Sequence, residues 1–267
     1  MSYFEKYIKY KNKYINLKAN KMIGGAEKVS NYYLHVRFDK NIEDKIKIVK
    51  EYLYDASYLR ESLLLNQKGE IIKENMPSHI TLAYGPKIKY DNDSDISTLE
   101  NLEIKSKKEI NNIYPDFVKK FKKMKPIIIY KGVTPFLRAD KIVLKMEIES
   151  EELKKAVLFL RKNTKDFDEI IEEWKISYEK KREQIKNRFP VLFTEDESFD
   201  KKNPKGFLHI TLISLKSDVN EDIIIQAIKE AENKLEEYGF KKDTEIKGDY
   251  IDIKTPITKR FIELFKI

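Results

Sequence analysis

Four residues, His-Ile-Thr-Leu, occur twice in this chain of 267 residues, once within MPSHITLAYGP and again within GFLHITLISLK. The two copies, at 79–82 and 209–212, use two of the only three histidines in the sequence. Side chains of a β-strand alternate between its two faces. Each quartet therefore predicts a strand that buries an isoleucine and a leucine and displays an imidazole beside a hydroxyl. The repeat also predicts a chain built from two similar halves.

Helical and strand patterns alternate around the two quartets, which predicts an α+β or α/β fold in which two sheets face each other. The expected elements are, in order, a strand at 32–38, a helix at 42–53, a turn at 66–69, the first quartet strand, a helix near 107–124, strands at 126–130 and 141–148 joined by a loop, a helix at 151–162, a long amphipathic helix at 166–189, the second quartet strand, a helix at 221–238 and a strand at 248–254.

The composition excludes several classes of function. Because the chain has no cysteine, it can form no disulfide, thiol nucleophile or thiolate metal site. It contains neither a phosphate-binding P-loop pattern nor the G-x-S-x-G pattern of hydrolase nucleophiles. No stretch approaches the roughly 18 apolar residues of a membrane span, and lysines stand where a signal peptide needs an apolar core. We therefore expect a cytoplasmic protein, monomeric and without a membrane span.

The positive charge of the chain is concentrated at its N-terminus. The net charge is +8, of which residues 1–30 contribute +5 through seven lysines and two glutamates. Tyrosines at 3, 7, 10 and 14 have helical spacing, and Gly24-Gly25 follows, so we expect a basic amphipathic helix and a flexible joint. Such a helix either packs on its own domain or contacts an anionic or protein partner. The segment resembles the YIKYKNKYINLK…IGG leaders of many proteins of amoeba-infecting giant DNA viruses, which implies a viral origin.

The repeated quartet fits chemistry at a phosphate group. If the two strands face each other, His79 and His209 converge, and one imidazole can accept a proton while the other donates one near neutral pH. The hydroxyls of Thr81 and Thr211 can donate hydrogen bonds to phosphate oxygens. This chemistry needs no metal and no cofactor. Either histidine alone fits a purely structural role in a strand, but the recurrence of the whole quartet favours a shared function.

The doubled His-x-Thr-x pattern, set in this order of elements, resembles the two-histidine (2H) phosphoesterases of the LigT-like, 2′–5′ RNA ligase-like type, over roughly residues 31–255. The resemblance implies an α+β bilobal fold with two pseudo-symmetric lobes whose sheets face a central groove. It implies metal-independent cleavage of 2′,3′-cyclic phosphates, 2′–5′ linkages or related nucleotide phosphodiesters. It also implies that His79 and His209 are the acid–base pair and that Thr81 and Thr211 hold the phosphate.

Five further residues are candidates for binding the substrate. Phe207 is expected to share a face with the second histidine, where it could stack on a nucleobase or cap the core. His35 and Arg37 share one face of the first strand, with Arg37 as a phosphate clamp if that strand lies beside a quartet strand. The alternative is an edge strand with a solvated polar face. Arg138 is a second candidate for the clamp, and Tyr84 either contacts substrate or packs in the core.

These features predict a leader at 1–30 and a 2H phosphoesterase domain at 31–267, enlarged by a helical insertion near 163–206. We expect a phosphodiesterase whose substrate is a nucleotide or an RNA end, such as 2′–5′ oligoadenylate, a 2′,3′-cyclic phosphate or a cyclic dinucleotide. In a virus, such an enzyme would counter the nucleotide signalling of the host, in the host cytoplasm or from the virion. The alternative is a non-catalytic RNA-binding or assembly protein that keeps the groove and uses the basic leader for contact.

Overall fold

The structure is a computed structural model that describes residues 28–66, 68–73, 77–90, 99–122, 125–138, 141–163, 183–190, 192–193, 208–254 and 261–267. The predicted leader helix lies outside the described residues, as does most of the insertion predicted near 163–206. Within the described part of the chain, no helix is long and apolar enough to cross a membrane.

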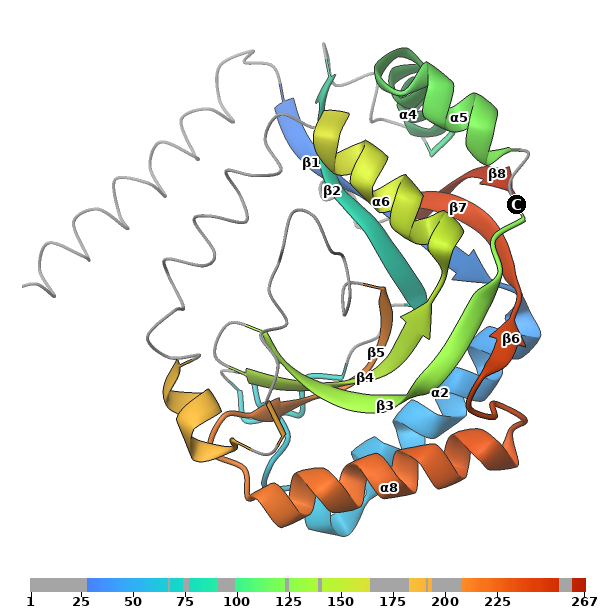
Figure 1. The fold of residues 1–267 in the computed structure, drawn as a ribbon. Helices are drawn as coiled ribbons and strands as arrows, with labels where there is room; N and C mark the ends of the chain where they lie inside the picture. The colour runs from blue at the N-terminus through green and yellow to red at the C-terminus, as the bar shows by residue number, and fades with distance from the viewer. Residues whose placement is uncertain are drawn as a thin grey trace, which may run out of the picture.

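Two four-stranded antiparallel sheets form the fold, which confirms the predicted α+β class (Figure 1). The first sheet has the strand order β2-β1-β7-β8, and the second has the order β5-β4-β3-β6. The strands of the first sheet are β1 (Lys28–Phe38), β2 (His79–Tyr90), β7 (Gly248–Lys254) and β8 (Phe261–Lys266). The strands of the second are β3 (Ile128–Arg138), β4 (Lys141–Glu149), β5 (His209–Lys216) and β6 (Thr244–Ile246).

The two sheets repeat one strand–helix–strand unit. In the first unit, β1 leads through α2 (Lys40–Asp55) to its antiparallel neighbour β2, and in the second, β4 leads through α6 (Glu151–Asn163) to its antiparallel neighbour β5. Both units end in a quartet strand, and each quartet strand is one of the two edge strands of its sheet. The repetition predicted from the quartets is therefore a repetition of structure, and it gives the molecule two pseudo-symmetric lobes.

The connecting helices pack against the opposite lobe. Helix α2, which leaves the first sheet, contacts β5 and α8 (Glu221–Glu237), and α8 contacts β3. Helix α6, which leaves the second sheet, contacts β2. Figure 1 shows α6 on the side of β1 and β2, near α4 (Leu99–Ile113) and α5 (Pro115–Phe121), while α2 and α8 lie on the side of β3 and β4. Each lobe therefore supplies a helix to the core of the other.

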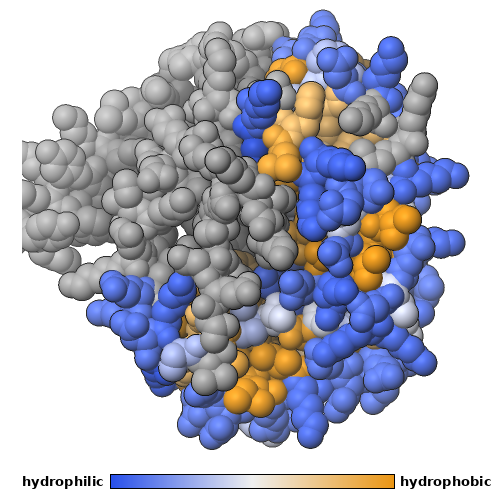
Figure 2. All heavy atoms as spheres, viewed as in Figure 1, coloured by the Kyte–Doolittle hydropathy of each residue, from blue (hydrophilic) through white to orange (hydrophobic). Residues whose placement is uncertain are grey.

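Local sequence explains where these helices begin and which face they bury. The Asp39 side chain accepts a hydrogen bond from the Ile42 backbone N–H (2.9 Å), and Asn220 caps α8 in the same way by accepting from Asp222. Buried residues of α2 follow helical spacing at 46, 49, 50, 53 and 54. Figure 2 shows a largely hydrophilic surface on the described residues in view, interrupted by separate apolar patches, as expected for a chain with 37% charged residues.

Three features differ from the sequence-based prediction. The single helix expected near 107–124 is two helices, because Pro115 disfavours helical backbone in the residue before it and starts α5. The loop expected between the strands at 126–130 and 141–148 belongs to β3, which runs to Arg138 as a hairpin with β4. Proline is tolerated there because the pairing of β3 with β6 ends at Tyr130, so Pro135 needs no N–H on that side. The strands β6 and β8 were not predicted.

Candidate active site

Each quartet forms the start of its strand, because β2 begins at His79 and β5 begins at His209. Ile80 and Leu82 are fully buried, as are the isoleucine and leucine at 210 and 212, whereas both histidines and both threonines are half-buried. This alternation confirms the predicted orientation of the quartets. Strands β2 and β5 also contact each other, although they belong to different sheets. The two imidazole–hydroxyl pairs are thus carried by neighbouring strands.

The first histidine is held in one tautomer by the backbone. The Nδ1 atom of His79 lies 2.8 Å from the carbonyl oxygen of Pro77. Because a carbonyl oxygen can only accept, this contact requires that Nδ1 carries a proton and donates it. In the neutral imidazole the lone pair then resides on Nε2. His79 is therefore arranged to accept a proton at Nε2.

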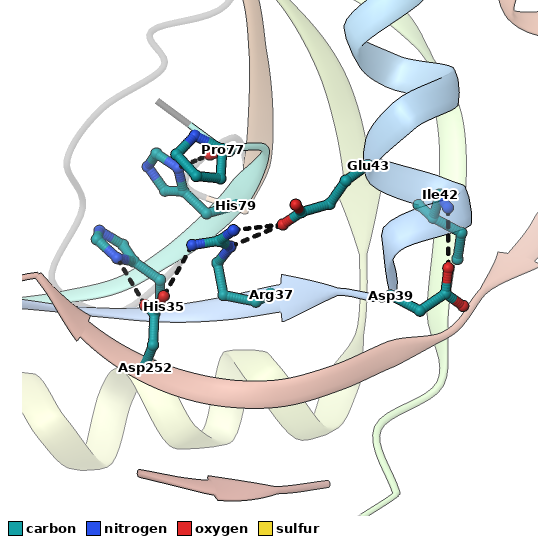
Figure 3. Close-up of polar contacts among 8 residues, drawn as sticks. All are labelled: His35, Arg37, Asp39, Ile42, Glu43, Pro77, His79 and Asp252. Atoms are coloured by element: carbon teal, nitrogen blue, oxygen red, sulfur yellow. Dashed lines mark hydrogen bonds and ion pairs between the residues drawn. The ribbon is translucent and has the colours of Figure 1, made fainter. Parts of the chain in front are cut away.

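The strand beside His79 carries a buried polar network. His35 and Arg37 are the cross-strand partners of Thr81 and His79, and they are only 2% and 3% exposed. A hydrogen bond of 3.1 Å joins His35 Nδ1 to Oδ1 of Asp252, and Arg37 Nη1 donates to Oδ2 of the same carboxylate (2.9 Å). Figure 3 shows these contacts joining β1 to β7, with His79 on the adjacent strand β2.

Strand β1 lies between β2 and β7, so the alternative prediction of an edge strand with a solvated polar face is wrong. Whether β1 is an edge or a central strand depends on its pairing with β7, which is more than 200 residues away. The local sequence pattern of β1 contains no information on that pairing. Arg37 also donates through Nε to Glu43 Oε1 (3.0 Å), and its Nη2 forms a second contact with the same oxygen. Arg37 is therefore paired with two carboxylates of the chain, those of Asp252 and Glu43.

Burial and neighbouring charges shift two pKa values in this network. The pKa of His79 lies well below its ordinary value because the imidazole is desolvated, and the neighbouring His35, Lys50 and Arg37 disfavour a further positive charge. The Pro77 carbonyl acts in the opposite direction. Burial raises the pKa of Asp252 to about 7, although the attraction of Arg37 opposes this increase.

The second histidine has different neighbours. His209 pairs across the strands with Glu147, and Thr211 pairs with Lys145. The His209 ring lies 4.9 Å from that of Phe136, measured between centroids, and the Lys145 ammonium lies 5.2 Å from the same Phe136 centroid. The two histidines therefore occupy equivalent places in their lobes, but the cross-strand partner of His79 is a cation and that of His209 is a carboxylate residue.

The remaining predicted binding residues are placed only in part. Phe207 lies outside the described residues. Tyr84 lies in β2, where it pairs with Tyr33, and Arg138 is the last residue of β3, but the structure does not describe the side chain of either. Their proposed contacts with a substrate stay predictions.

Sequence reasoning missed Asp252 and Lys145. Both are charged residues inside runs that read as strands, YIDIK and IVLKMEI, and both are almost completely buried in the structure. A charge in the interior of an apolar strand is costly to bury without a partner, so it signals a network. The partner itself could not be predicted, because Asp252 meets His35 across a separation of 217 residues.

No cluster of three or more histidine, cysteine, aspartate or glutamate residues suited to a metal ion occurs among the described residues. No family model and no curated protein matches the chain. Among solved structures it is similar to Kluyveromyces marxianus Usb1 with uridine monophosphate and to Kluyveromyces marxianus Usb1, with 12% and 11% identity. Each similarity has a TM-score of 0.33 and covers 88% of this chain and 97% of that chain. At this level of similarity, the function has to be inferred from the chain's own residues.

Proposed function

We propose that this chain is a metal-independent 2H phosphodiesterase that cleaves 2′-linked or 2′,3′-cyclic nucleotide phosphodiesters. His79 and His209 are the acid–base pair, and Thr81 and Thr211 hold the phosphate. Candidate substrates are 2′–5′ oligoadenylate, 2′,3′-cyclic phosphates at RNA ends and cyclic dinucleotides with a 2′–5′ bond. Activity on these molecules in a host cell would counter nucleotide signalling.

The observation that carries this proposal is the equivalent placement of the two quartets. Each one begins an edge strand of its own sheet, each buries isoleucine and leucine completely, and the two strands contact each other. A strand needs only its buried pair for stability, so the core does not require that the other face repeat an imidazole and a hydroxyl. A shared ligand between the two strands explains that repetition.

The chemistry follows from what the four side chains can do. One imidazole accepts the proton of the attacking hydroxyl or water while a new bond forms between that oxygen and phosphorus. The bond from phosphorus to the departing oxygen breaks, and the second imidazole donates a proton to this oxygen. Hydrogen bonds from the threonine hydroxyls to the non-bridging oxygens stabilise the charge that develops on them.

The test is a turnover assay in EDTA with four substrates: 2′–5′ oligoadenylate, a 2′,3′-cyclic mononucleotide, a cyclic dinucleotide with one 2′–5′ bond, and a 3′–5′ dinucleotide as a control. We expect cleavage of at least one 2′-linked or cyclic substrate and none of the control. His79→Ala and His209→Ala should each lower kcat/KM by about 10²–10⁴-fold, the range that general acid–base catalysis contributes.

The matched control variant is Tyr130→Phe. Within the described residues, the buried Tyr130 hydroxyl has no hydrogen-bond partner, and it belongs to β3 rather than to a quartet strand. This variant should keep wild-type kcat/KM. Full activity in both alanine variants would refute the proposed acid–base pair. No turnover on any substrate, together with salt-sensitive RNA binding that is lost on removal of residues 1–30, would favour the RNA-binding alternative.

A further inference from the structure

The network behind His79 contains more ionisable groups than a strand needs for stability. Register places Thr81, His35 and Asp252 in one row across β2, β1 and β7. The row beside it contains His79, Arg37 and Tyr250. Buried ionisable groups are costly unless they are paired, and an apolar residue at position 35 would avoid that cost. Because His35 lies between Asp252 and His79, a functional role explains why an ionisable residue occupies this position.

His35 contacts both the carboxylate and the proposed catalytic imidazole. Its ring centroid lies 4.2 Å from that of His79, with an angle of 51° between the ring planes, and its Nδ1 is hydrogen-bonded to Asp252. Arg37 holds the other oxygen of Asp252 and is itself anchored to Glu43 on α2. The orientation of His35 is therefore fixed by Asp252 on β7, which is held by Arg37 on β1, and Arg37 is held in turn by Glu43 on α2 (Figure 3).

The His35–Asp252 pair can take up one proton near neutral pH, since burial raises the pKa of Asp252 to about 7. The two groups share a hydrogen bond, so that proton belongs to the pair rather than to one residue. Once it is bound, the unit of Arg37, Asp252 and His35 has gained a positive charge next to His79. A second proton on His79 is then disfavoured, and its lone pair stays available.

Other charged groups around His79 act in the same direction or are already engaged. Lys50, on the buried face of α2, also disfavours a positive charge on His79. Glu43 is held by Arg37, as described above. At the equivalent strand position of the second lobe, His209 has a carboxylate residue, Glu147, as its cross-strand partner, where His79 has the cation Arg37. Lys145, the other charge on that face of β4, lies against Phe136.

We propose that His35, fixed by Asp252 and Arg37, is a positioning residue that keeps His79 neutral, which makes His79 the proton acceptor and His209 the proton donor of the pair. This inference rests on the proposed function. In the forward step, the attacking O–H gives its proton to Nε2 of His79 as the new O–P bond forms. The departing oxygen takes a proton from His209 as its bond to phosphorus breaks. His79 is then protonated and His209 neutral, and exchange with water restores both.

The test is an NMR titration of imidazole ¹⁵N and ¹³C signals in the full chain, which needs no turnover. With only three histidines in the chain, single substitutions assign every signal. In the wild type we expect His79 to be neutral at pH 7 with the proton on Nδ1, and to be protonated only well below pH 6.5. A wild-type His79 with its proton on Nε2, or with an ordinary pKa, would overturn the proposal.

Two substitutions separate the proposed effect from a folding defect. His35→Gln keeps an amide that can donate to Asp252 but removes the ionisable ring, so the pKa of His79 should rise. Asp252→Asn removes one of the two carboxylates that neutralise Arg37, the other being Glu43, and should leave the pKa of His79 unchanged or lower it. A loss of structure would instead move the pKa of His79 toward the ordinary histidine value in both variants. Tyr130→Phe is the control and should leave the titration of His79 unchanged.

The same variants are then assayed for kcat/KM against pH. In His35→Gln the acidic limb should move to higher pH, and a shift of one pH unit lowers kcat/KM on that limb by about tenfold. An unchanged limb and an unchanged His79 titration in His35→Gln would refute the role of His35 while leaving the phosphodiesterase intact. The expected NMR shifts without turnover on any substrate would refute the phosphodiesterase and the assignment of acceptor and donor, leaving only the control of His79 by His35.

Discussion

The two histidines occupy matching positions with different neighbours, and this difference bears on their chemistry more than their shared motif does. Arg37 is the cross-strand partner of His79, whereas Glu147 is the partner of His209. A neighbouring cation disfavours the imidazolium form and a neighbouring carboxylate favours it. At the level of single residues, the pseudo-symmetry of the lobes is therefore broken at the place where the proposed reaction needs one acid and one base.

Each threonine hydroxyl should contribute to catalysis by donating one hydrogen bond to a phosphate oxygen. Thr81→Val and Thr211→Val keep the β-branched shape of the side chain but remove the donor. Each should lower kcat by about 10²–10³-fold, the cost of losing one donor to a developing oxyanion. Thr81→Ser and Thr211→Ser restore the hydroxyl and should recover most of the activity. Steady-state kinetics on the best substrate measures both, and equal activity of the valine and serine variants would exclude this role.

Removal of the Arg37 side chain should destabilise the fold strongly. Arg37→Met leaves the buried Asp252 carboxylate without its cation, and breaking a buried ion pair on one side costs about 3–5 kcal/mol in the free energy of unfolding. The matched control is Lys131→Met, because Lys131 also contacts two acidic residues, Asp243 and Glu149, but is exposed to solvent. Urea denaturation should show a large loss for the first variant and little change for the second. Comparable losses would mean that burial is not the cause.

At the scale of elements, helix α2 is the part that ties the network to the second lobe. It supplies Glu43 to Arg37 and Lys50 to the surroundings of His79, and it also contacts β5. The start of this helix is fixed by the Asp39 cap. Asp39→Ala should cost about 0.5–2 kcal/mol of stability, whereas Asp39→Asn, which keeps an accepting oxygen, should cost little. Equal midpoints in urea for the two variants would show that the cap does not stabilise α2.

Strands and helices with a strong local pattern could be predicted from the sequence, and their partners could not. The quartet strands and the helices at 40–55, 151–163 and 221–237 match the prediction because alternation and helical spacing are local properties. The extension of β3 through Pro135 was missed because its tolerance depends on where β6 stops pairing. In the site, the four quartet residues could be named in advance, while Asp252 required the register of β1 and β7.

At the scale of the molecule, the two lobes are not independent units. Helix α2 leaves the first sheet and contacts β5, and helix α6 leaves the second sheet and contacts β2. Unfolding of either sheet therefore removes a packing partner from the other. One continuous set of buried apolar residues spans both sheets and their helices, which also joins the lobes energetically.

We therefore expect one cooperative unfolding transition, tested with equivalent core substitutions in the two lobes. Ile80→Ala and Ile210→Ala each create a cavity at a fully buried quartet position, and each should cost about 2–5 kcal/mol. If the lobes unfold together, either variant shifts the entire transition. Circular dichroism and the native NMR signals of His79 and His209 then report the same midpoint urea concentration. If the lobes were separable, the native NMR signal of His79 in Ile80→Ala would disappear at a lower urea concentration than that of His209. In Ile210→Ala the native signal of His209 would disappear first. That pattern would contradict the mutual packing of α2 and α6 as a determinant of stability.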